Sequence, residues 1–487
     1  MLKISKKNPY IIITLIYLII FVPIIFIRYP DIRNELKYFI VIDEMINSKN
    51  YFILTYFSEL YPDKPPLYFW LLLILKKYTP NLFFPLSILL GSLLPSFGIS
   101  ILVFKLVKKI KNSNFALLSS IMLTTTPFFM GVSSFLRMDM LMSFFISLSL
   151  YLFFSLYLSK EIKKINLIFL YISIILGILT KGGAGFAIPI ITIFSFLFLE
   201  KNLKFLSKIH IFKGILSIII ILSVWFFIIY NKPEGKNYIS LMLNQETIGR
   251  ISNAKAHSRP FYFYIKKIPL ILFPYGIILI GAFISYIKNF KNIFFLSLIE
   301  KIGISWGIAP LIFFSLLDGK LDIYLIPLYP GFIIITLSFL YISKNTKIKS
   351  MTIKISKIIT FIPILFEKIF NKKSKIKHLI LSSFIIYLAF PLAINKYNDK
   401  FTLNNLYTII KYDSNSQIFS YKFNDFINMK TNIKKEITSL SNEIELNTIN
   451  NSKKSLIICK NKYANEISQF ENFTLIYKNK SYSLFSN

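Results

Sequence analysis

Carboxylate side chains are concentrated in the polar stretch that follows the first apolar run of this 487-residue chain. Asp31 and Glu35 lie four residues apart, and an apolar stripe at helical spacing runs from Tyr38 to Met45. The spacing predicts a helix over residues 34–47 that lies on a membrane surface and presents its carboxylates just above the hydrocarbon. Carboxylates placed in this way can orient a substrate group or accept its proton. The alternative is a solvated helix with ordinary surface charge.

A lysine in the same polar stretch could act on an anion. Lys64 precedes Pro65 and Pro66, which make the local backbone stiff and extended, and an amphipathic helix is predicted over residues 67–78. A fixed ammonium group near the headgroup level suits a lipid-linked phosphate, which needs charge neutralisation more than shape. The alternative is a lysine that extends to lipid headgroups without a specific ligand.

Two more charged groups interrupt the apolar sequence at the ends of apolar runs. Arg137 and Asp139 stand where one run ends and the next begins, so they form either a functional pair or a structural ion pair between helices. Lys320 and Tyr324 are four residues apart at the start of another run. This spacing predicts that they share one helix face that points toward the outer interface.

A polar loop that contains His257 and Arg259 is followed at once by the aromatic run at residues 260–264. Such a run is typical of the belt where a helix enters the membrane interface. A lone histidine is structural more often than it is a ligand, and only a partner carboxylate would indicate a metal role for His257.

The elements that must hold these residues are membrane-spanning helices. The chain is 54% hydrophobic with a mean hydropathy of +0.59 and only 16% charged residues, which excludes an ordinary soluble protein. Apolar stretches of about 18 residues or more recur, each long enough to cross a hydrocarbon core of roughly 30 Å. The predicted spans are residues 10–27, 84–106, 115–134, 140–158, 166–180, 184–199, 212–230, 268–287, 294–316, 322–342 and 378–395.

The distribution of lysines predicts the orientation of these eleven spans. Every second loop is basic, so the positive-inside rule places the N-terminus in the cytoplasm and the C-terminus outside. The first apolar run lacks a small-residue cleavage site and is expected to be a retained span. Residues 351–370 are apolar but carry lysines toward both ends, so we expect an interfacial amphipathic helix there. Twelve or thirteen spans are the alternatives.

The chain divides by composition into two predicted domains. Residues 1–395 form a transmembrane domain with a long first outer loop at residues 28–83, and residues 396–487 form an outer domain. The tail is polar and carries short alternating apolar runs, with a helical stretch near residues 429–444, which predicts a small α/β domain. The fold class is therefore an all-α polytopic membrane protein with outer juxtamembrane helices and a small C-terminal α/β domain.

The net charge of +34 invites a nucleic-acid partner, but the lysines cluster in the loops between spans, where anionic lipid headgroups are the expected counter-charge. No nucleic acid is therefore expected to bind. The single cysteine, Cys459, excludes an internal disulfide and a cysteine-based metal cluster.

Six short motifs occur in a fixed order along residues 10–345. They begin at Arg33 (RNELKY, followed by DEM), Asp63 (DKPPLYFW), Arg137 (RMDML), Leu179 (LTKG), His257 (HSRPFY) and Gly319 (GKLDIY). In order and spacing they resemble the aminoarabinose-transferase and protein-mannosyltransferase families, which are polyprenyl-phosphate-sugar-dependent glycosyltransferases of the GT-C fold. Each motif alone is weak, whereas six in order, all in loops that the charge distribution places outside, are a specific combination.

The resemblance implies transfer of a sugar from a polyprenyl phosphate donor to a lipid or glycan acceptor, with inversion at the anomeric carbon. It implies Glu35, with Asp31 as a rival, as the catalytic carboxylate, and no organic cofactor. The residues implied to bind the donor phosphate are Lys64, Arg259, Lys320 and Tyr324. Further site candidates are Lys37, Arg137, Asp139 and Lys181. A structural, zinc-like divalent metal is implied at Asp63 and His257, although two ligands alone do not make a site.

The chain departs from the family pattern at two positions. Many relatives carry an Asp-Glu pair where this chain has Asn34-Glu35, and an arginine where it has Lys37. Some relatives keep only the glutamate, so Glu35 can serve. If the acceptor is itself a phosphate group, as on lipid A, no strong base is needed, and the carboxylate would position a sugar or an amine instead.

Three functions compete at this point. The first is a lipid-phosphate glycosyltransferase in the bacterial inner membrane, acting on lipid A or another glycolipid. The second is a protein O-glycosyltransferase of the same fold. The third is a transporter or non-catalytic scaffold. For a transporter we would expect charged or broken helices at mid-membrane depth and an internal repeat, and a scaffold would leave the six ordered motifs unexplained. The charges lie instead at the ends of the spans, which favours an enzyme.

Overall fold

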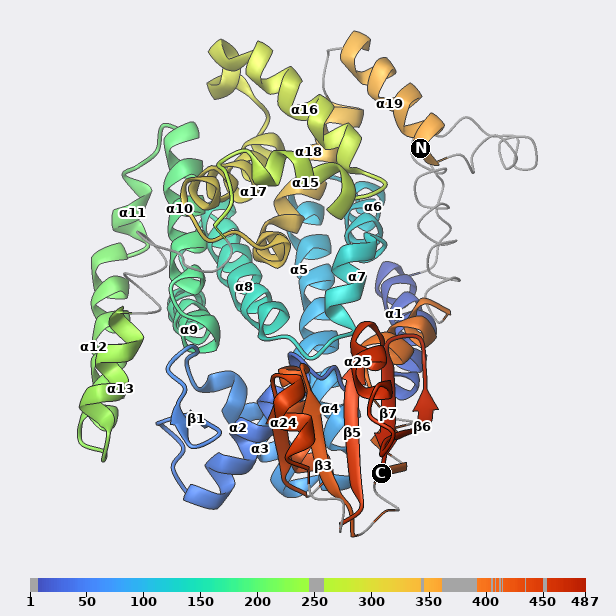
Figure 1. Cartoon of the computed structure of the whole chain (residues 1–487). Coiled ribbons are helices and arrows are strands. Elements are labelled where there is room, and N and C mark those ends of the chain that lie inside the picture. The colour runs from blue at the N-terminus through green and yellow to red at the C-terminus, as the bar shows by residue number, and fades with distance from the viewer. Residues whose placement is uncertain are drawn as a thin grey trace. The chain divides into compact units, whose positions relative to one another are not determined.

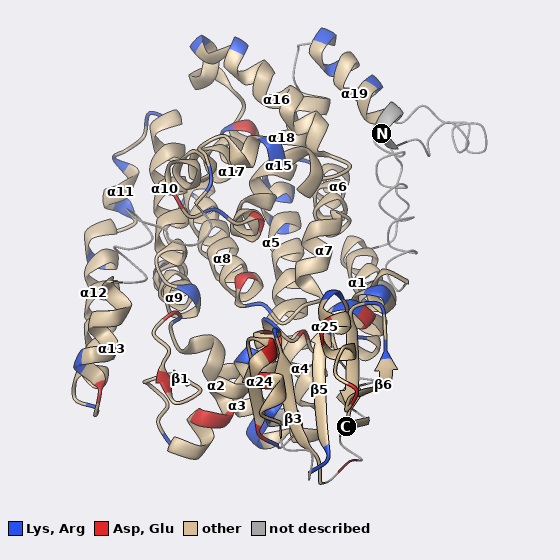
Figure 2. Cartoon of the chain, in the orientation of Figure 1, with Lys and Arg blue, Asp and Glu red and all other residues tan. Residues whose placement is uncertain are grey.

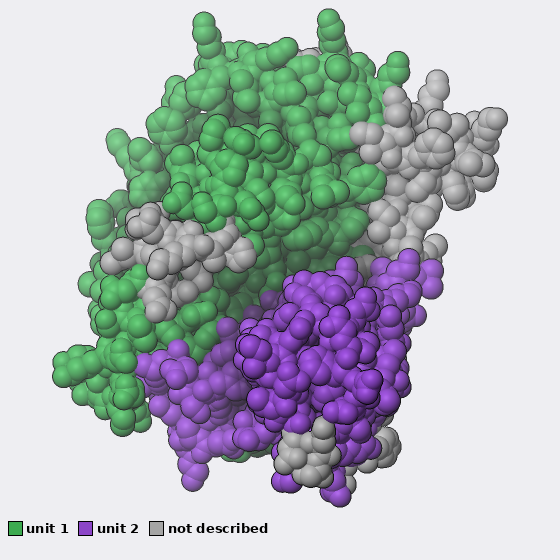
Figure 3. All heavy atoms as spheres, viewed as in Figure 1, with its two compact units in different colours: residues 1–23, 61–388 green, residues 24–60, 389–487 purple. Residues whose placement is uncertain are grey.

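The computed structural model describes residues 8–244, 258–342, 346–360 and 392–487, the last range without residues 404–405, 408, 411–412, 414, 434 and 450–452. The chain forms two compact units, which are coloured separately in Figure 3. Unit 1 comprises residues 1–23 and 61–388, and unit 2 comprises residues 24–60 and 389–487. Residues 24–60 therefore fold with the C-terminal segment and not with the helices that follow them in the sequence.

Unit 1 is helical (Figure 1). Its helices are α1 (Pro9–Ile27, with its last residues in unit 2), α3 (Leu67–Tyr78), α4 (Phe83–Ile88), α5 (Leu94–Ile110), α6 (Ser113–Thr124), α7 (Pro127–Ser133), α8 (Met138–Leu158), α9 (Lys164–Lys181), α10 (Ala184–Leu199), α11 (Phe205–Lys208), α12 (Ile211–Tyr230), α13 (Gly235–Leu241), α15 (Phe263–Ile271), α16 (Gly276–Lys288), α17 (Leu298–Leu316), α18 (Tyr329–Tyr341) and α19 (Thr346–Thr360). Short turns of other helix types are η1 (Pro80–Leu82), η2 (Leu89–Leu93), η4 (Phe290–Phe295) and η5 (Asp322–Leu328).

Within the described residues, seven helical segments are long and apolar enough to cross a membrane. Helices α6 and α7 form an eighth candidate that is bent by 67°, and α10 and α16 are shorter apolar helices. These ten coincide with ten of the predicted spans, and the remaining span at residues 378–395 falls almost wholly outside the described residues. The chain is therefore a multi-pass membrane protein, as predicted.

Charged residues are rare within these helices, and buried hydroxyl groups form hydrogen bonds inside their own helix. Figure 2 shows that the helices of unit 1 other than α19 carry little charge along their lengths, with Lys, Arg, Asp and Glu mostly near helix ends and in loops. Buried hydroxyl groups donate to the carbonyl one turn earlier, as Ser119 does to Phe115 (3.0 Å) and Thr336 does to Phe332 (2.7 Å). Because lipid offers no hydrogen-bond partner, such internal pairing removes the cost of a polar side chain in a span.

A tight connection joins α9 to α10 in unit 1. Gly182 ends α9 with φ of +78°, a conformation that favours glycine. Beyond it, a Cβ on Gly185 would lie 2.3 Å from the Gly177 carbonyl carbon, so the two helix backbones touch. This close contact fixes the end of α9, where the predicted site residue Lys181 lies.

Helix α19 covers the first part of the segment that was expected to be interfacial. It packs against α16, where a Cβ on Gly281 would lie 2.3 Å from Cγ2 of Thr352. Its lysines recur along the helix, and it does not qualify as a span. Residues 361–370 lie outside the described residues, so the interfacial placement of residues 351–370 stays a prediction.

Unit 2 begins at the end of α1 and continues through a turn into α2 (Glu35–Ser48). The face of α2 that carries Tyr38, Ile42 and Met45 is buried, as the helical spacing predicts. A two-stranded antiparallel hairpin, β1 (Thr55–Tyr56) and β2 (Glu59–Leu60), follows it.

The C-terminal part of unit 2 is a five-stranded sheet in the order β4-β3-β5-β7-β6. Its strands are β3 (Gln417–Tyr421), β4 (Ile437–Leu440), β5 (Ser455–Lys460), β6 (Thr474–Lys478) and β7 (Tyr482–Ser486). Strands β4 and β5 are parallel to β3, whereas β7 is antiparallel to β5 and β6 is antiparallel to β7. Short helices lie between the strands: η6 (Asn424–Met429), α23 (Lys430–Ile433), α24 (Glu443–Asn447), η7 (Asn461–Tyr463) and α25 (Ala464–Ser468).

The predicted helix near residues 429–444 is wrong. This stretch contains strand β4, whose residues pair in parallel register with β3, Ile418 opposite Ile437 and Tyr421 opposite Leu440. Asn442 then caps α24 by accepting the N–H of Glu445 at 2.9 Å, so a new helix starts there. Pairing with a distant strand overrides the local helical pattern, as is common for short β segments.

Candidate active site

Glu35, the predicted catalytic carboxylate, lies in the first turn of α2 and is 1% exposed. Its Oε2 forms an ion pair with Arg28, whose side chain is fully buried, and it accepts the backbone N–H of Asp31 at 2.7 Å. A buried carboxylate without a partner would be costly, and the ion pair with Arg28 offsets the cost of burying Glu35. Two donors on one oxygen also fix the direction of the carboxylate.

Asp31, the rival carboxylate, is 3% exposed and has both of its oxygens in use. Its Oδ1 accepts the backbone N–H of Asn34 at 2.7 Å and the side-chain Nδ2 at 3.0 Å, and its Oδ2 accepts the hydroxyl of Tyr397 at 2.7 Å. Burial raises the pKa of Tyr397, and the charges of Asp31 and Glu35 raise it further, so this hydroxyl keeps its proton and donates. These bonds make Asp31 a positioning residue that holds the turn in front of Glu35.

Asp31 and Glu35 do not share a helix face, because Asp31 lies before the start of α2. Helix α2 starts at Glu35, and Asp31 lies in the preceding turn, where its carbonyl accepts the N–H groups of Glu35 (3.2 Å) and Leu36 (3.1 Å). The Asn34 side chain bonds to Asp31 and forms no cap on the helix. The two carboxylates are therefore neighbours through the turn and not through helical periodicity.

Lys37 lies on the same helix and faces the hairpin of unit 2. Its Nζ lies 4.7 Å from the ring centroid of Tyr56, whose hydroxyl donates to Asn428. Asn428 in turn donates to the carbonyl of Ile32 at 2.7 Å, one residue beyond Asp31. The turn that carries the carboxylates is thus braced from the C-terminal part of the unit.

In unit 1 the predicted phosphate ligands Arg259 and Lys320 come from two loops that are paired through their backbones. Ser258 and Gly319 form an isolated antiparallel bridge, and the N–H of Arg259 donates to the carbonyl of Asp318 at 3.1 Å. Lys320 is 2% exposed, and its Nζ donates to the carbonyls of Arg259 (2.8 Å) and Leu317. The two cations are therefore adjacent in the fold.

The ammonium group of Lys320 is held by neutral carbonyls. Burial lowers its pKa, and the Asp318 charge partly offsets this effect. A lysine ammonium has three protons, and no third acceptor for this one occurs among the described residues. A buried cation whose charge is not cancelled by an ion pair is suited to bind an anion such as a phosphate oxygen.

The spacing of Lys320 and Tyr324 predicts a shared helix face, and this prediction is wrong. The helical turn η5 begins at Asp322, so Lys320 lies in the loop before it. Tyr324 contacts Lys181 instead, whose Nζ lies 5.0 Å from its ring centroid. Lys181 also forms an ion pair with Asp139 in the first turn of α8, and both side chains are largely buried. This cluster joins three predicted site residues from three helices.

Asp322 is a site residue that the sequence did not single out. Its Oδ2 lies 3.5 Å from Nζ of Lys267, and its Oδ1 is a buried atom without a hydrogen-bond partner among the described residues. An unsatisfied buried carboxylate oxygen costs free energy unless a ligand supplies a donor. Asp322 lies two residues from Lys320, so this segment carries both a cation and a carboxylate oxygen that can accept a hydrogen bond.

Hydrogen bonds hold Arg137 and Lys64 in position. Arg137 lies just before α8, where its backbone exchanges hydrogen bonds with the Ser92 hydroxyl at 3.2 and 3.4 Å. Lys64 donates to the carbonyl of Asp63 at 2.6 Å, and the helix predicted after its two prolines is α3, with the predicted bounds.

Of the two predicted metal ligands, Asp63 and His257, the structure describes only Asp63. Asp63 is partly buried, and His257 lies outside the described residues. No group of three His, Cys, Asp or Glu side chains that could hold a metal ion occurs in the part of the chain that the structure describes. A divalent metal at Asp63 and His257 stays a prediction, and no step of the chemistry is derived from it.

Arg28 and Tyr397 complete the carboxylate site but were not predicted. Arg28 is the first charged residue after the apolar run of α1, which could have marked it as the nearest counter-charge for Glu35. Tyr397 lies 366 residues from Asp31 along the chain, in the helical segment 392–401, and no spacing could have joined the two.

Known proteins resemble this chain in sequence and in fold. The family model for dolichyl-phosphate-mannose-protein mannosyltransferase matches residues 63–227. Over 359 residues, the chain is 31% identical to undecaprenyl phosphate-alpha-4-amino-4-deoxy-L-arabinose arabinosyl transferase of Wigglesworthia glossinidia brevipalpis, covering 72% of this chain and 62% of that protein. It is 26% identical to an uncharacterized protein of Aquifex aeolicus, covering 69% and 66% of the two chains. The matches thus span less than two thirds of these relatives.

The fold is shared over nearly the whole chain with a solved structure. The crystal structure of ArnT from Cupriavidus metallidurans bound to undecaprenyl phosphate is similar with a TM-score of 0.72, 12% identity and coverage of 99% of this chain and 98% of that one. The apo form of the same protein gives a TM-score of 0.69. The predicted resemblance to the aminoarabinose transferases and their GT-C fold is confirmed.

Proposed function

We propose that this chain, a relative of the aminoarabinose transferases with their GT-C fold, is a membrane glycosyltransferase. It transfers a sugar from an undecaprenyl phosphate donor to an acceptor on the outer face of the bacterial inner membrane, with inversion at the anomeric carbon. The observation that carries the proposal is the pair of built sites: a buried, oriented carboxylate at Glu35 and a buried cation at Lys320 that neutral carbonyls hold. The sequence relatives include undecaprenyl phosphate-alpha-4-amino-4-deoxy-L-arabinose arabinosyl transferases.

On the donor side, unit 1 supplies the cations. Lys320 neutralises the phosphate that becomes the leaving group, and Arg259 and Lys64 add positive charge to it, which lowers the barrier to breaking the bond between the anomeric carbon and the phosphate oxygen. Oδ1 of Asp322, for which the described part of the chain offers no hydrogen-bond partner, accepts a hydrogen bond from the sugar. Tyr324 is held against Lys181 and shapes the same loop.

On the acceptor side, Glu35 of unit 2 acts. An acceptor oxygen forms the new bond to the anomeric carbon from the face opposite the phosphate, and undecaprenyl phosphate departs with the bonding electrons. Where the acceptor is a hydroxyl, Glu35 takes its proton. Where the acceptor is a phosphate, no proton is released, and Glu35 then orients the sugar or its amine. Asp31 and Tyr397 hold Glu35 in position.

The acceptor in this proposal is lipid A or another glycolipid, because the named relatives are arabinosyl transferases. A protein acceptor is the second candidate, because the family model that matches residues 63–227 is that of protein mannosyltransferases. The N-terminus would lie in the cytoplasm and the C-terminal sheet outside, as the basic loops predict.

Mass spectrometry of a deletion strain tests the proposal. Lipid A, surface glycans and outer proteins are compared between the deletion strain and a strain that expresses the wild-type chain, and one class of molecule should lose a sugar mass in the deletion. Complementation with Glu35→Gln or Lys64→Ala should restore at most about a tenth of the modification at equal protein levels. Full complementation by both variants would remove these residues from the mechanism.

A further inference from the structure

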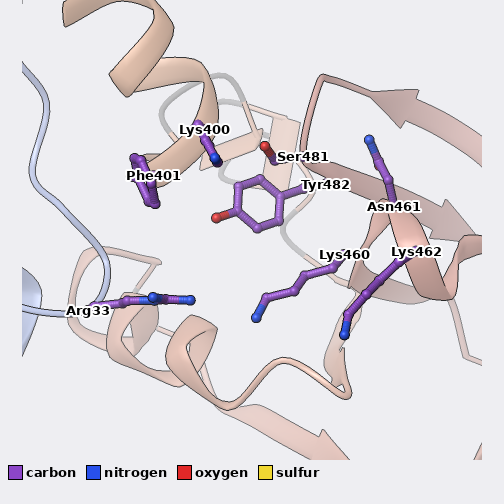
Figure 4. A pocket seen from close by; sticks show the side chains of 8 residues that line it. All are labelled: Arg33, Lys400, Phe401, Lys460, Asn461, Lys462, Ser481 and Tyr482. Atoms are coloured by element: carbon purple, nitrogen blue, oxygen red, sulfur yellow. The ribbon is translucent and has the colours of Figure 1, made fainter. Parts of the chain in front are cut away.

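Unit 2 contains a pocket that the proposed transfer does not use. It encloses about 310 Å³ and is lined by Arg33, Lys400, Phe401, Lys460, Asn461, Lys462, Ser481 and Tyr482 (Figure 4). The lining comes from four segments that all belong to this unit: the turn before α2, the end of the helical segment 392–401, the end of β5 with η7, and the start of β7.

The pocket lies where the sheet topology favours a ligand. Strands β3, β4 and β5 are parallel, and Lys460 is the last residue of β5, so the pocket opens at the carboxyl end of a parallel strand. This is the edge at which open α/β sheets bind their ligands. Lys460 pairs directly with Tyr482 on β7, which places both side chains on the same face.

The charge of the pocket is strongly positive. Four of its eight lining residues are cations, and none of the eight is a carboxylate. Asp425 binds Nε of Arg33 at 2.9 Å, and Glu466 lies near Lys462, but no ion pair of Lys400, Lys460 or Lys462 occurs among the described residues. In Figure 4 the ends of Arg33 and Lys460 approach the same space beside the Tyr482 ring. Four cations against one carboxylate that pairs with Arg33 leave the pocket with excess positive charge, which attracts an anion of more than one charge.

The walls of the pocket are fixed before any ligand binds. The Tyr482 ring stacks on Phe423 with centroids 5.0 Å apart and an interplanar angle of 15°, and Lys460 lies 5.1 Å from the same Phe423 ring. Asn479 accepts the N–H groups of Ser481 (2.8 Å) and Tyr482 (2.7 Å), which holds the turn into β7. Such preorganisation reduces the entropy lost on binding.

Uncharged donors are present as well. Burial raises the pKa of Tyr482 to about 12, so its hydroxyl stays protonated at neutral pH and can donate to an anion. Phe401 contributes an apolar side chain to the lining. A site that combines several cations, a hydroxyl donor and aromatic walls matches a phosphate ester with an organic group attached.

We propose that this pocket is a second phosphate site, which binds a phosphomonoester such as the headgroup of a phosphorylated lipid or a free phosphorylated compound. It is distinct from the donor-phosphate residues of unit 1, because every lining residue belongs to unit 2. The inference does not depend on the proposed sugar transfer.

Lysine footprinting on the full chain tests the site directly. The protein is placed in nanodiscs of phosphatidylcholine, and the acetylation rates of individual lysines are measured by mass spectrometry with and without inorganic phosphate. Phosphate should slow the acetylation of Lys460 and Lys462 at least threefold and leave Lys478, an exposed lysine of the same unit, unchanged. High salt should remove the protection, because the contacts are electrostatic.

A second arm identifies the source of the phosphate group. Nanodiscs that contain phosphatidic acid, with no free phosphate, present a phosphomonoester in the membrane. Protection of Lys460 and Lys462 in this arm indicates a lipid headgroup as ligand, and protection by free phosphate alone indicates a soluble one. Equal acetylation rates in all conditions would overturn the proposal.

Matched variants complete the test. Lys460→Gln with Lys462→Gln should weaken the binding of radiolabelled phosphate at this site at least tenfold, whereas Lys430→Gln with Lys478→Gln, an equal loss of charge outside the pocket, should leave it unchanged. Equal affinity in the two double variants would contradict the assignment. Because no sugar transfer is measured, the result does not depend on the enzymatic activity.

Discussion

The carboxylate site of unit 2 and the Lys320 loop of unit 1 are both buried, yet their charges are treated in opposite ways. Glu35 is balanced by Arg28 in an ion pair, and its neighbour Asp31 is saturated by N–H and O–H donors. Lys320 is held by two neutral carbonyls, which orient the ammonium group without cancelling its charge. The ion pair with Arg28 lowers the free-energy cost of burying the Glu35 carboxylate in a fixed orientation. Carbonyl groups do not neutralise the Lys320 ammonium group, so it still attracts an anion.

This difference shows how one chain can provide an oriented carboxylate in one region and an anion-binding cation in another. The oxygen of Glu35 is fixed in direction, which suits proton transfer or the orientation of an acceptor. The ammonium group of Lys320 gains a counter-charge only when an anion arrives, which suits a phosphate that becomes more negative as it leaves. The contrast predicts that variants in the two regions fail in different ways.

The largest effect is expected at Glu35. Glu35→Gln removes the charge but keeps the shape, and should lower sugar transfer by about 10²- to 10⁴-fold, the range for loss of a general acid or base. Asp31→Asn should cost much less, because Asp31 positions the turn. The measurement is transfer in membranes with equal amounts of each variant.

Loss of fold is the competing explanation for Glu35→Gln, because it removes the carboxylate charge that pairs with the buried Arg28. The double variant Arg28→Met with Glu35→Gln removes both charges. Its thermal unfolding temperature should recover toward that of the wild type while transfer stays absent. Recovery of transfer along with stability would show that Glu35 is only structural.

The next largest effect is expected at Lys320. Lys320→Met should lower transfer by about 10²- to 10³-fold, since a cation at the leaving phosphate is removed. Lys266→Met is the matched control, because Lys266 is an exposed lysine of α15, and it should stay within about threefold of the wild type. Equal losses in both lysine variants would remove the distinction between a phosphate ligand and ordinary surface charge.

The pH dependence sharpens the assignment of Lys320. Its pKa is lowered by burial, so as the pH rises the group loses its proton, and with it phosphate binding, earlier than an exposed lysine would. Transfer should therefore decline on the alkaline side of the pH profile. Lys320→Arg, which stays protonated, should move this decline to higher pH. An unchanged alkaline limb would show that another group controls it.

The smallest effect is expected at Tyr397. Tyr397→Phe removes one hydrogen bond to Asp31, which should cost about 1 kcal/mol, and should lower transfer about fivefold through a less well fixed turn. Tyr477→Phe on β6 is the control and should leave both stability and transfer unchanged. A loss as large as that of Glu35→Gln would give Tyr397 a direct part in the reaction.

The membrane helices and the motif positions could be predicted because they depend on local sequence. A span is recognised from the average hydropathy of a continuous run, and ten predicted spans coincide with helical segments of the structure. The position of Lys181 at the end of α9, next to two glycines, was likewise visible in the sequence.

The contacts between the site residues could not be predicted, because they join residues that are distant in the sequence. Asp31 and Tyr397 are 366 residues apart, and strand β4 exists only because β3 lies beside it. The pairing of Lys181 with Tyr324 was missed for the same reason, since the helical spacing pointed from Tyr324 to Lys320. Local periodicity gives the face of an element but does not identify the element that meets it.

Release of polyprenyl phosphate tests the central claim most directly. Purified wild-type protein is added to liposomes made from the lipid extract of the deletion strain, which contains both donors and lipid acceptors, and polyprenyl phosphate and its sugar-linked form are followed by mass spectrometry. Wild-type protein should convert the sugar-linked form into free polyprenyl phosphate, while Glu35→Gln and Lys320→Met should not. Unchanged donor lipid with the wild-type protein, or equal conversion by both variants, would contradict the account.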